Sequence, residues 1–295
     1  MHACLVEIAA RLWYTCLWND VNAINRLEVI AMVIDFHVHA FNPKIAEKAI
    51  SVLEQRAQIV PYTRGLIEQT VDRMDEWGID KSVMLPIATK PSQQTVINDW
   101  AAQQDSDRII SFGSVHPDAE DAAEELERIK QLGLHGVKLH PDYQGFFINE
   151  KRVDPLLDAI EKAELPVVFH SGFDVVSPDI IHCTAEAALE MIKRHKHLKA
   201  VFAHLGCNEC WQDVYDLLAG IDGEVYFDTA FTSRKCSDDM MQRIICKHGA
   251  DRILFASDMP WDSPALIREK ILGLNISDDA KEKILGLNAQ RLLGL

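Results

Sequence analysis

The sequence is poor in positive charge. Its 295 residues include 30 lysines and arginines against 45 aspartates and glutamates, which gives a formal net charge of −15. A surface that binds nucleic acid needs clustered lysine and arginine to neutralise phosphates. The composition therefore argues against a nucleic-acid partner, and we expect a small-molecule substrate instead.

The sequence also lacks the features of secreted and membrane-bound chains. The apolar run near the N-terminus is too short and too interrupted for a signal peptide or a membrane span. The seven cysteines are odd in number and scattered, without the spacing of a disulfide framework. We expect reduced thiols, a cytoplasmic location and no membrane partner, and the sequence leaves a homo-oligomer open.

Residues 1–31 differ from the rest of the chain. They carry Trp13, Tyr14 and Trp18 in a short amphipathic stretch and then become rich in asparagine. Met32 begins the sequence Met-Val-Ile-Asp-Phe-His, where a fold that starts on a strand would begin. We expect residues 1–31 to be an appendage without function and residues 32–295 to form one domain.

From residue 32 onward, short apolar runs alternate with helical patterns. The runs are rich in β-branched and aromatic residues, as buried parallel strands are. Eight runs occur, the number that closes a (β/α)8 barrel. They are residues 33–39, 82–87, 109–116, 136–140, 167–172, 200–206, 225–231 and 253–258. The sequence thus predicts an α/β fold, a (β/α)8 TIM barrel, with two short closing helices within residues 277–293.

Several predicted strands end on side chains that bind divalent metals. His37 and His39 stand two apart at the end of the first strand, so their side chains share a face. His170, His204 and Asp258 end three later strands. A parallel barrel brings its strand ends together at one rim, and imidazole and carboxylate are zinc ligands. The sequence therefore predicts a metal centre at the C-terminal face of the strands.

Further side chains are predicted near this centre. Asp35 stands two residues before His37 and, in an alternating strand, shares the face of His37 and His39 one step deeper in the barrel. Its carboxylate could there hold the second nitrogen of a ligating imidazole. Lys138 and His140 form a same-face pair on the fourth strand. A buried, unpaired ammonium is unfavourable. Lys138 is therefore expected to be carboxylated and to bridge two metals, to form a salt bridge, or to bind an anionic substrate.

Residues 32–295 resemble the amidohydrolase superfamily, in its amidohydrolase-related branch of metal-dependent barrel hydrolases. Five segments, one at the end of each of five predicted strands, carry the resemblance. They are Ile-Asp-Phe-His-Val-His (34–39), Gly-Val-Lys-Leu-His-Pro (136–141), Val-Phe-His-Ser-Gly (168–172), Phe-Ala-His-Leu-Gly (202–206) and Ala-Ser-Asp-Met-Pro-Trp (256–261).

The resemblance implies a metal held by four side chains, His37, His39, His170 and Asp258. It further implies that His204 binds a second metal or acts on the substrate. In two-metal members of the family the residue matching Lys138 is carboxylated, which would make Lys138 a ligand as well. Four histidines that fall in predicted loops or helices are expected at the surface. They are His182, His195, His197 and His248.

The predicted reaction is metal-dependent hydrolysis of a small-molecule amide, lactone or ester by activated water. One or two divalent ions, zinc before others, would lower the pKa of bound water. Asp258 would move the proton, and His204 or His140 would support the developing oxyanion. The alternative is a lyase, a metal-dependent non-oxidative decarboxylase of an aromatic or unsaturated carboxylic acid, with Lys138 or a nearby arginine holding the carboxylate. His140 and Tyr143 are expected to contact the substrate.

Overall fold

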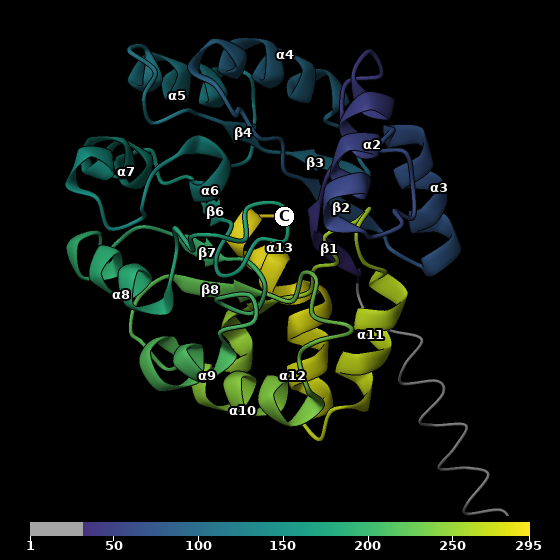
Figure 1. Ribbon diagram of the computed structural model, residues 1–295. Helices are drawn as coiled ribbons and strands as arrows, with labels where there is room; N and C mark the ends of the chain where they lie inside the picture. Colours follow the sequence, from purple (N-terminus) through teal and green to yellow (C-terminus); the bar gives the residue numbers. More distant parts are fainter. Residues whose placement is uncertain (1–31) are drawn as a thin grey trace, which may run out of the picture. The chain divides into compact units, whose positions relative to one another are not determined.

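The computed structural model describes residues 32–295, so the predicted appendage of residues 1–31 lies outside the described residues. Within that range, strands stand side by side in the middle and helices surround them (Figure 1). The strands are β1 (Ile34–Val38), β2 (Lys81–Met84), β3 (Ile109–Ser111), β4 (Gly113–Ser114), β5 (Val137–Leu139), β6 (Val167–Phe169), β7 (Ala200–Phe202), β8 (Val225–Asp228) and β9 (Ile253–Leu254).

All strand pairs are parallel, and backbone hydrogen bonds join their two sheets into a ring. One sheet has the order β1-β2-β3 and the other runs in order from β4 to β9. Between β3 and β4, Phe112 N donates to Met84 O at 3.0 Å. Just beyond β9, Phe255 O accepts from the N of Phe36, a residue of β1, at 2.8 Å. The predicted TIM barrel is confirmed, with its third strand divided into β3 and β4.

Helices follow the strands in turn, and most of them surround the ring, while the last one is drawn across its middle (Figure 1). They are α2 (Ala46–Ala57), α3 (Ile67–Trp77), α4 (Gln94–Gln104), α5 (Ala122–Gln131), α6 (Pro141–Gln144), α7 (Asp154–Lys162), α8 (Ala185–Arg194), α9 (Trp211–Asp213), α10 (Asp238–His248), α11 (Pro264–Gly273), α12 (Asp278–Glu282) and α13 (Asn288–Leu293). Short 3₁₀ or π turns occupy Pro91–Gln93, Lys151–Val153, Val214–Leu218, Ala250–Arg252 and Lys283–Leu287. No helix within residues 32–295 combines the length and apolarity that crossing a bilayer requires.

The barrel interior is filled by apolar side chains from most of the strands and from α13. Its members are Ile34, Phe36, Val83, Leu85, Ile110, Phe112, Val168, Val201, Tyr226, Ala230, Leu254, Ala256, Ala289 and Leu292. Layers of branched and aromatic side chains of this kind make a barrel a packed core rather than a pore. The polar side chains of the site therefore stand on a rigid apolar floor.

A register shift in β1 changes which of its residues face the interior. Ile34 and Phe36 belong to the interior cluster. The pairing with β2 then shifts between Asp35 and Val38. An extra residue of this kind reverses the alternation of the strand beyond it. His37 and His39 consequently face the interior as well, and both line its cavity.

Two histidines that the sequence places at the surface are buried. His248 is 1% exposed, and its Nε2 lies 3.0 Å from Val225 O. His195 is 4% exposed, and its Nε2 lies 3.1 Å from Asp154 Oδ1. Both fall where a helix ends against the barrel, so tertiary packing buries them. The surface prediction is wrong for these two residues.

Candidate metal centre

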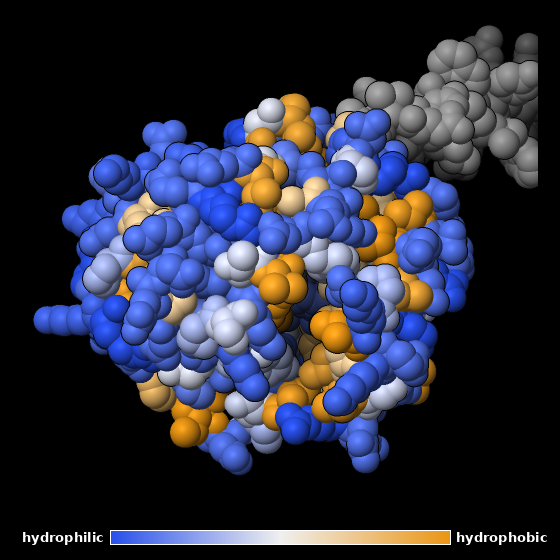
Figure 2. All heavy atoms as spheres, turned by 90° about the horizontal axis from the view of Figure 1, so that it is seen from above, coloured by the Kyte–Doolittle hydropathy of each residue, from blue (hydrophilic) through white to orange (hydrophobic). Residues whose placement is uncertain are grey.

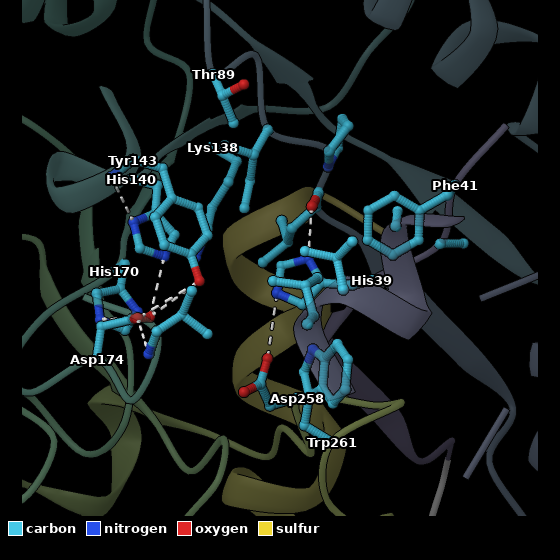
Figure 3. A pocket seen from close by; sticks show the side chains of 18 of the residues that line it. His39, Phe41, Thr89, Lys138, His140, Tyr143, His170, Asp174, Asp258 and Trp261 are labelled. Carbon is cyan, nitrogen blue, oxygen red and sulfur yellow. Dashed lines mark hydrogen bonds and ion pairs between the residues drawn. The ribbon is translucent and has the colours of Figure 1, made fainter. Parts of the chain in front are cut away.

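Three side chains from the first and last strands converge at the C-terminal rim. His37 Nε2 and His39 Nε2 are 3.1 Å apart. Asp258 Oδ1 lies 3.1 Å from His39 Nε2 and 3.4 Å from His37 Nε2. Figure 3 shows the side chains of His39 and Asp258 pointing toward one another across the pocket floor. We call His37, His39 and Asp258 the first ligand group.

Each imidazole of this group is oriented by an acceptor on its other nitrogen. His37 Nδ1 lies 2.8 Å from Asp228 Oδ2, and His39 Nδ1 lies 2.9 Å from Leu85 O. Because those Nδ1 atoms face acceptors, they carry the hydrogen, and both Nε2 lone pairs point to one place. Two lone pairs and a carboxylate oxygen facing one another suit a divalent cation. The donor set therefore fits the metal that the sequence predicts.

The carboxylate that orients His37 comes from Asp228, not from Asp35. Asp35 accepts hydrogen bonds from Ser257 N, at 2.8 Å, and from the Ser257 hydroxyl. The prediction for Asp35 is wrong because the register shift in β1 breaks the alternation on which it rested. Asp228 ends the apolar run of β8, which is the pattern that marks the other ligands. That signal was in the sequence, but the predicted strand ran past it to residue 231.

Lys138 lies beside the first ligand group. Its Nζ is 3.4 Å from His37 Nε2, and the residue is 1% exposed. Burial lowers the pKa of Lys138 to about 8, although Asp228 and Asp258 oppose that shift. Within residues 32–295 no carboxylate lies within 4.0 Å of Nζ. The salt bridge that the sequence offered for Lys138 is therefore not formed there.

A second group of metal-type side chains lies across the pocket from the first, with Lys138 between them (Figure 3). It consists of His140, His170 and Asp174, all buried, and we call it the second ligand group. Asp174 Oδ2 is 3.7 Å from His140 Nε2 and 3.8 Å from His170 Nε2. The rings of His140 and His170 stack with centroids 4.1 Å apart. The structure thus places His170 in a different group from His37.

A chain of hydrogen bonds runs through the predicted catalytic residue His204. His204 Nδ1 lies 3.1 Å from Ala230 O, and His204 Nε2 lies 3.0 Å from His170 Nδ1. If His204 carries its hydrogen on Nδ1, its Nε2 accepts from His170, which leaves His170 Nε2 with a free lone pair. That Nε2 atom is buried and has no hydrogen-bond partner within residues 32–295. An orphaned imidazole nitrogen of this kind is a site where a ligand belongs.

The backbone is strained at two of the predicted site residues. Asp258 has a φ of 70° and His204 a φ of 62°, in the left-handed region that non-glycine residues seldom adopt. Hydrogen bonds hold both conformations. Asp258 N donates to His37 O at 2.8 Å, and His204 N donates to Asp228 Oδ1 at 2.9 Å. Such strain gathers at functional sites, where the surroundings fix it. Asp228 thus positions two histidines, one through each carboxylate oxygen.

Both ligand groups open into one cavity of about 880 Å³. The predicted substrate contacts His140 and Tyr143 line it, and their rings stack with centroids 3.7 Å apart. Tyr143 lies in α6, and its hydroxyl donates to Asp174 Oδ2 at 3.3 Å. Asp174 is a site residue that the sequence reasoning missed. Its only signal is an acidic position four residues beyond His170.

Solved structures share this fold at low sequence identity. A dihydroxybenzoic acid decarboxylase from Polaromonas sp., with bound manganese and the inhibitor 2-nitroresorcinol, is 19% identical and has a TM-score of 0.67, with 90% of this chain and 97% of that chain covered. An uncharacterised TIM-barrel protein from Bordetella bronchiseptica is 21% identical and has a TM-score of 0.72, with 89% and 98% covered. A putative amidohydrolase from Staphylococcus aureus is 18% identical and has a TM-score of 0.67, with 90% and 100% covered.

These likenesses show the fold. No curated protein matches the sequence. The family model described as Amidohydrolase matches residues 34–295, which is nearly the whole described range. That range begins at the strand that carries His37 and ends beyond α13. The chain belongs to the amidohydrolase family of metal-dependent barrel enzymes.

Proposed function

We propose that this chain catalyses the metal-dependent non-oxidative decarboxylation of an aromatic or unsaturated carboxylic acid. The observation that carries the proposal is the buried amine of Lys138. It lies next to the first ligand group and has no carboxylate within 4.0 Å in residues 32–295. A buried cation without an anionic partner is unfavourable until a ligand supplies one. A substrate carboxylate is such a ligand.

The first ligand group, His37, His39 and Asp258, would hold the ion, with zinc or manganese as the metals to test. The ion would supply a Lewis acid that draws electrons from the substrate when bound. Lys138 orients the substrate carboxylate by a charge-assisted hydrogen bond. When carbon dioxide leaves, the electron pair of the broken carbon–carbon bond stays on the substrate carbon. Asp258 takes a proton from solvent and delivers it to that carbon.

Two features of Asp258 support this role. Its Oδ1 faces both histidines of the first ligand group, which leaves Oδ2 for the substrate side. Burial opposes ionisation of Asp258, but the hydrogen bond with His39 lowers its pKa, so the carboxylate is ionised and can accept the proton that it then delivers.

The stacked rings of His140 and Tyr143 form a flat wall beside Lys138, which suits a planar substrate. The solved structures named as decarboxylases make this reaction the first to test.

Hydrolysis of an amide, lactone or ester is the second candidate. The observation that favours it is the presence of two ligand groups on one cavity, because a second ion would give a two-metal hydrolase site. In that case Lys138 would be carboxylated and would lie between the ions. The number of metals and the chemical state of Lys138 separate the two candidates.

The deciding experiment uses the full chain loaded with Mn²⁺ or Zn²⁺. Carbon dioxide release from 2,6-dihydroxybenzoate and related acids is compared with hydrolysis of p-nitrophenyl acetate. Lys138→Met is expected to keep one bound metal and to weaken benzoate binding by about 10- to 100-fold, the cost of a lost charge-assisted hydrogen bond. Lys130→Met, on the exposed side of α5, is the matched control. Two metals in the wild type, with one lost in Lys138→Met, would contradict decarboxylation and support hydrolysis.

A further inference from the structure

The cavity is larger than the metal centre needs, and its two ends differ in character. The inner end carries the two ligand groups and Lys138. The outer end is lined by residues of α2 and α4. A volume of about 880 Å³ lies near the upper end of the range for pockets that hold drug-sized ligands. A single carboxylated ring at the metal would leave the outer end unfilled.

The face of α2 that borders the cavity is apolar. Ile45, Ala49, Val52 and Leu53 line the cavity at the spacing of one helix face. The helix packs its other stripe, with Ala46 and Ile50, into the protein. Ile45 is 53% exposed and Val52 is 41% exposed. Part of the stripe that lines the cavity therefore faces water.

Helix α4 presents a similar stripe across the cavity. Val96, Ile97 and Trp100 line it at helical spacing, and Val96 is 69% exposed. Figure 2 views the molecule from the top of Figure 1, on the side of α4, and shows a hollow bordered by hydrophobic side chains. Two partly exposed apolar walls on one cavity are a site for an apolar ligand. We call the space between α2 and α4 the outer channel.

Basic residues of α2, and Lys44 just before it, lie among these apolar residues. Lys44, Lys48 and Arg56 line the cavity and are exposed. Within the part of the chain that the structure describes, none of the three forms an ion pair, whereas Glu47 and Glu54 of the same helix pair with Arg64. In a chain with a net charge of −15, three cations without partners at one mouth are a local exception. They complement an anionic group.

We propose that the substrate is elongated and amphiphilic, with its reacting carboxyl or carbonyl group at the metal centre. An apolar chain or extended ring system then fills the outer channel, and an anionic group at its far end meets Lys48 and Arg56. This inference rests on the proposed function, because it takes the metal centre as the place of reaction. Along α2, residues 45–57 span about 18 Å of helix axis, which allows a long apolar segment.

The test measures binding to the full, Mn²⁺-loaded chain by isothermal titration calorimetry, with no turnover required. The probes are benzoate, dodecanoate and dodecanedioate. Dodecanoate is expected to bind at least about tenfold more tightly than benzoate, because each buried methylene contributes up to about fourfold. Dodecanedioate is expected to bind several-fold more tightly again, because its second carboxylate reaches the basic mouth.

Two variants locate the effect. Val52→Glu should weaken dodecanoate binding at least tenfold and leave benzoate binding unchanged, and Arg56→Glu should remove the advantage of dodecanedioate alone. The controls are Val60→Glu, at an apolar position 79% exposed outside the cavity lining, and Lys130→Glu on α5. Neither control should change any of the three affinities. Melting temperatures verify that each variant is folded.

Equal affinities for benzoate and dodecanoate would overturn the proposal and leave the proposed function standing. Unchanged dodecanoate binding in Val52→Glu, together with a lower molecular mass in sedimentation, would also overturn it, since the rim would then be an interface between copies of the chain. A chain that shows the expected affinities but releases no carbon dioxide and hydrolyses no ester would contradict the proposed function alone.

Discussion

The two ligand groups of the cavity differ in how closely their ligand atoms approach one another and in how their imidazoles are oriented. In the first group, His37 and His39 each have an acceptor on Nδ1 at 2.8 or 2.9 Å, and their Nε2 atoms are 3.1 Å apart. In the second group, the closest pairs of ligand atoms that involve Asp174 are 3.7 and 3.8 Å apart. Its His170 Nε2 has no hydrogen-bond partner within the described residues.

The difference shows what turns metal-type residues into a metal site. Both groups contain two imidazoles and one carboxylate, so residue type does not distinguish them. The position of the imidazole hydrogens does. In the first group both Nδ1 atoms face acceptors, so both Nε2 atoms have free lone pairs, whereas His140 Nδ1 accepts from Tyr143 N at 3.4 Å, which leaves the hydrogen on its Nε2. His170 resembles the first group, because its Nδ1 faces His204 and its Nε2 has no hydrogen-bond partner within the described residues. Substitutions in and around the two groups test this contrast.

The largest effect is expected for Asp258→Asn. The change removes the only carboxylate of the first ligand group and its predicted proton carrier while keeping the shape of the side chain. Metal affinity and turnover should both fall by more than the roughly 10- to 100-fold that loss of an outer partner costs. Metal content by mass spectrometry and activity on the acid panel measure this. Asp174→Asn, in the second ligand group, should retain its metal.

His170→Ala should have the next largest effect. The sequence predicts His170 as a fourth ligand of the first ion, and its orphaned Nε2 is free to take that role. We expect a loss of metal affinity of at least about tenfold, read by competition with a chelating dye. His140→Ala, which removes the ring stacked on His170, is the control and should change substrate binding instead. Equal metal affinity in both variants would contradict a role for His170 as a ligand of the ion at the first group.

A smaller loss is expected for Asp228→Asn. Its carboxylate holds the Nδ1 of His37 and the backbone of His204, so the amide would weaken the orientation of both. Metal affinity should fall by about 10- to 100-fold with the fold intact. Asp35→Asn is the matched control, because Asp35 is equally buried but contacts Ser257 and the backbone N of His37 rather than an imidazole. If Asp35→Asn weakened metal binding and Asp228→Asn did not, the assignment of the orienting carboxylate would be reversed.

The smallest effect is expected on the pH dependence of the stability of the barrel. Burial, with Arg252 nearby, lowers the pKa of His248 to about 3 from an ordinary value of 6.5. Between these pH values the unfolded chain binds the extra proton, so stability falls as pH drops below about 6.5, by up to about 1.4 kcal/mol per pH unit. His248→Gln should flatten this dependence in urea unfolding between pH 7.5 and 5. The exposed His197→Gln should leave the slope as in the wild type, and an equal slope in His248→Gln would contradict the assignment.

Much of the fold could be predicted because barrel strands are buried on both faces and read as apolar runs. All eight predicted runs contain strands of the ring. Most end earlier than predicted, as at Phe169 before His170 and at Leu254 before Asp258. The reason is physical: the chain must leave the sheet so that ligands at the rim can turn toward one another.

Contacts between distant residues could not be read from the sequence. The role assigned to Asp35 failed because a register shift within one strand leaves no pattern in the residues themselves. Asp174 and the separation of His170 from His37 depend on where a loop returns over the barrel. The burial of His195 and His248 depends on helix packing. The candidate residues could be read from the ends of the predicted strands. Their division into two ligand groups could be read only from the structure.

Anomalous diffraction from crystals of the full chain loaded with Zn²⁺ tests the central claim most directly. Data on both sides of the zinc edge locate the ion without assumptions about its ligands. We predict a peak bonded to His37 Nε2, His39 Nε2 and Asp258, with nitrogen ligands at about 2.0–2.1 Å. A zinc peak confined to His140, His170 and Asp174, with none at the first ligand group, would contradict the account.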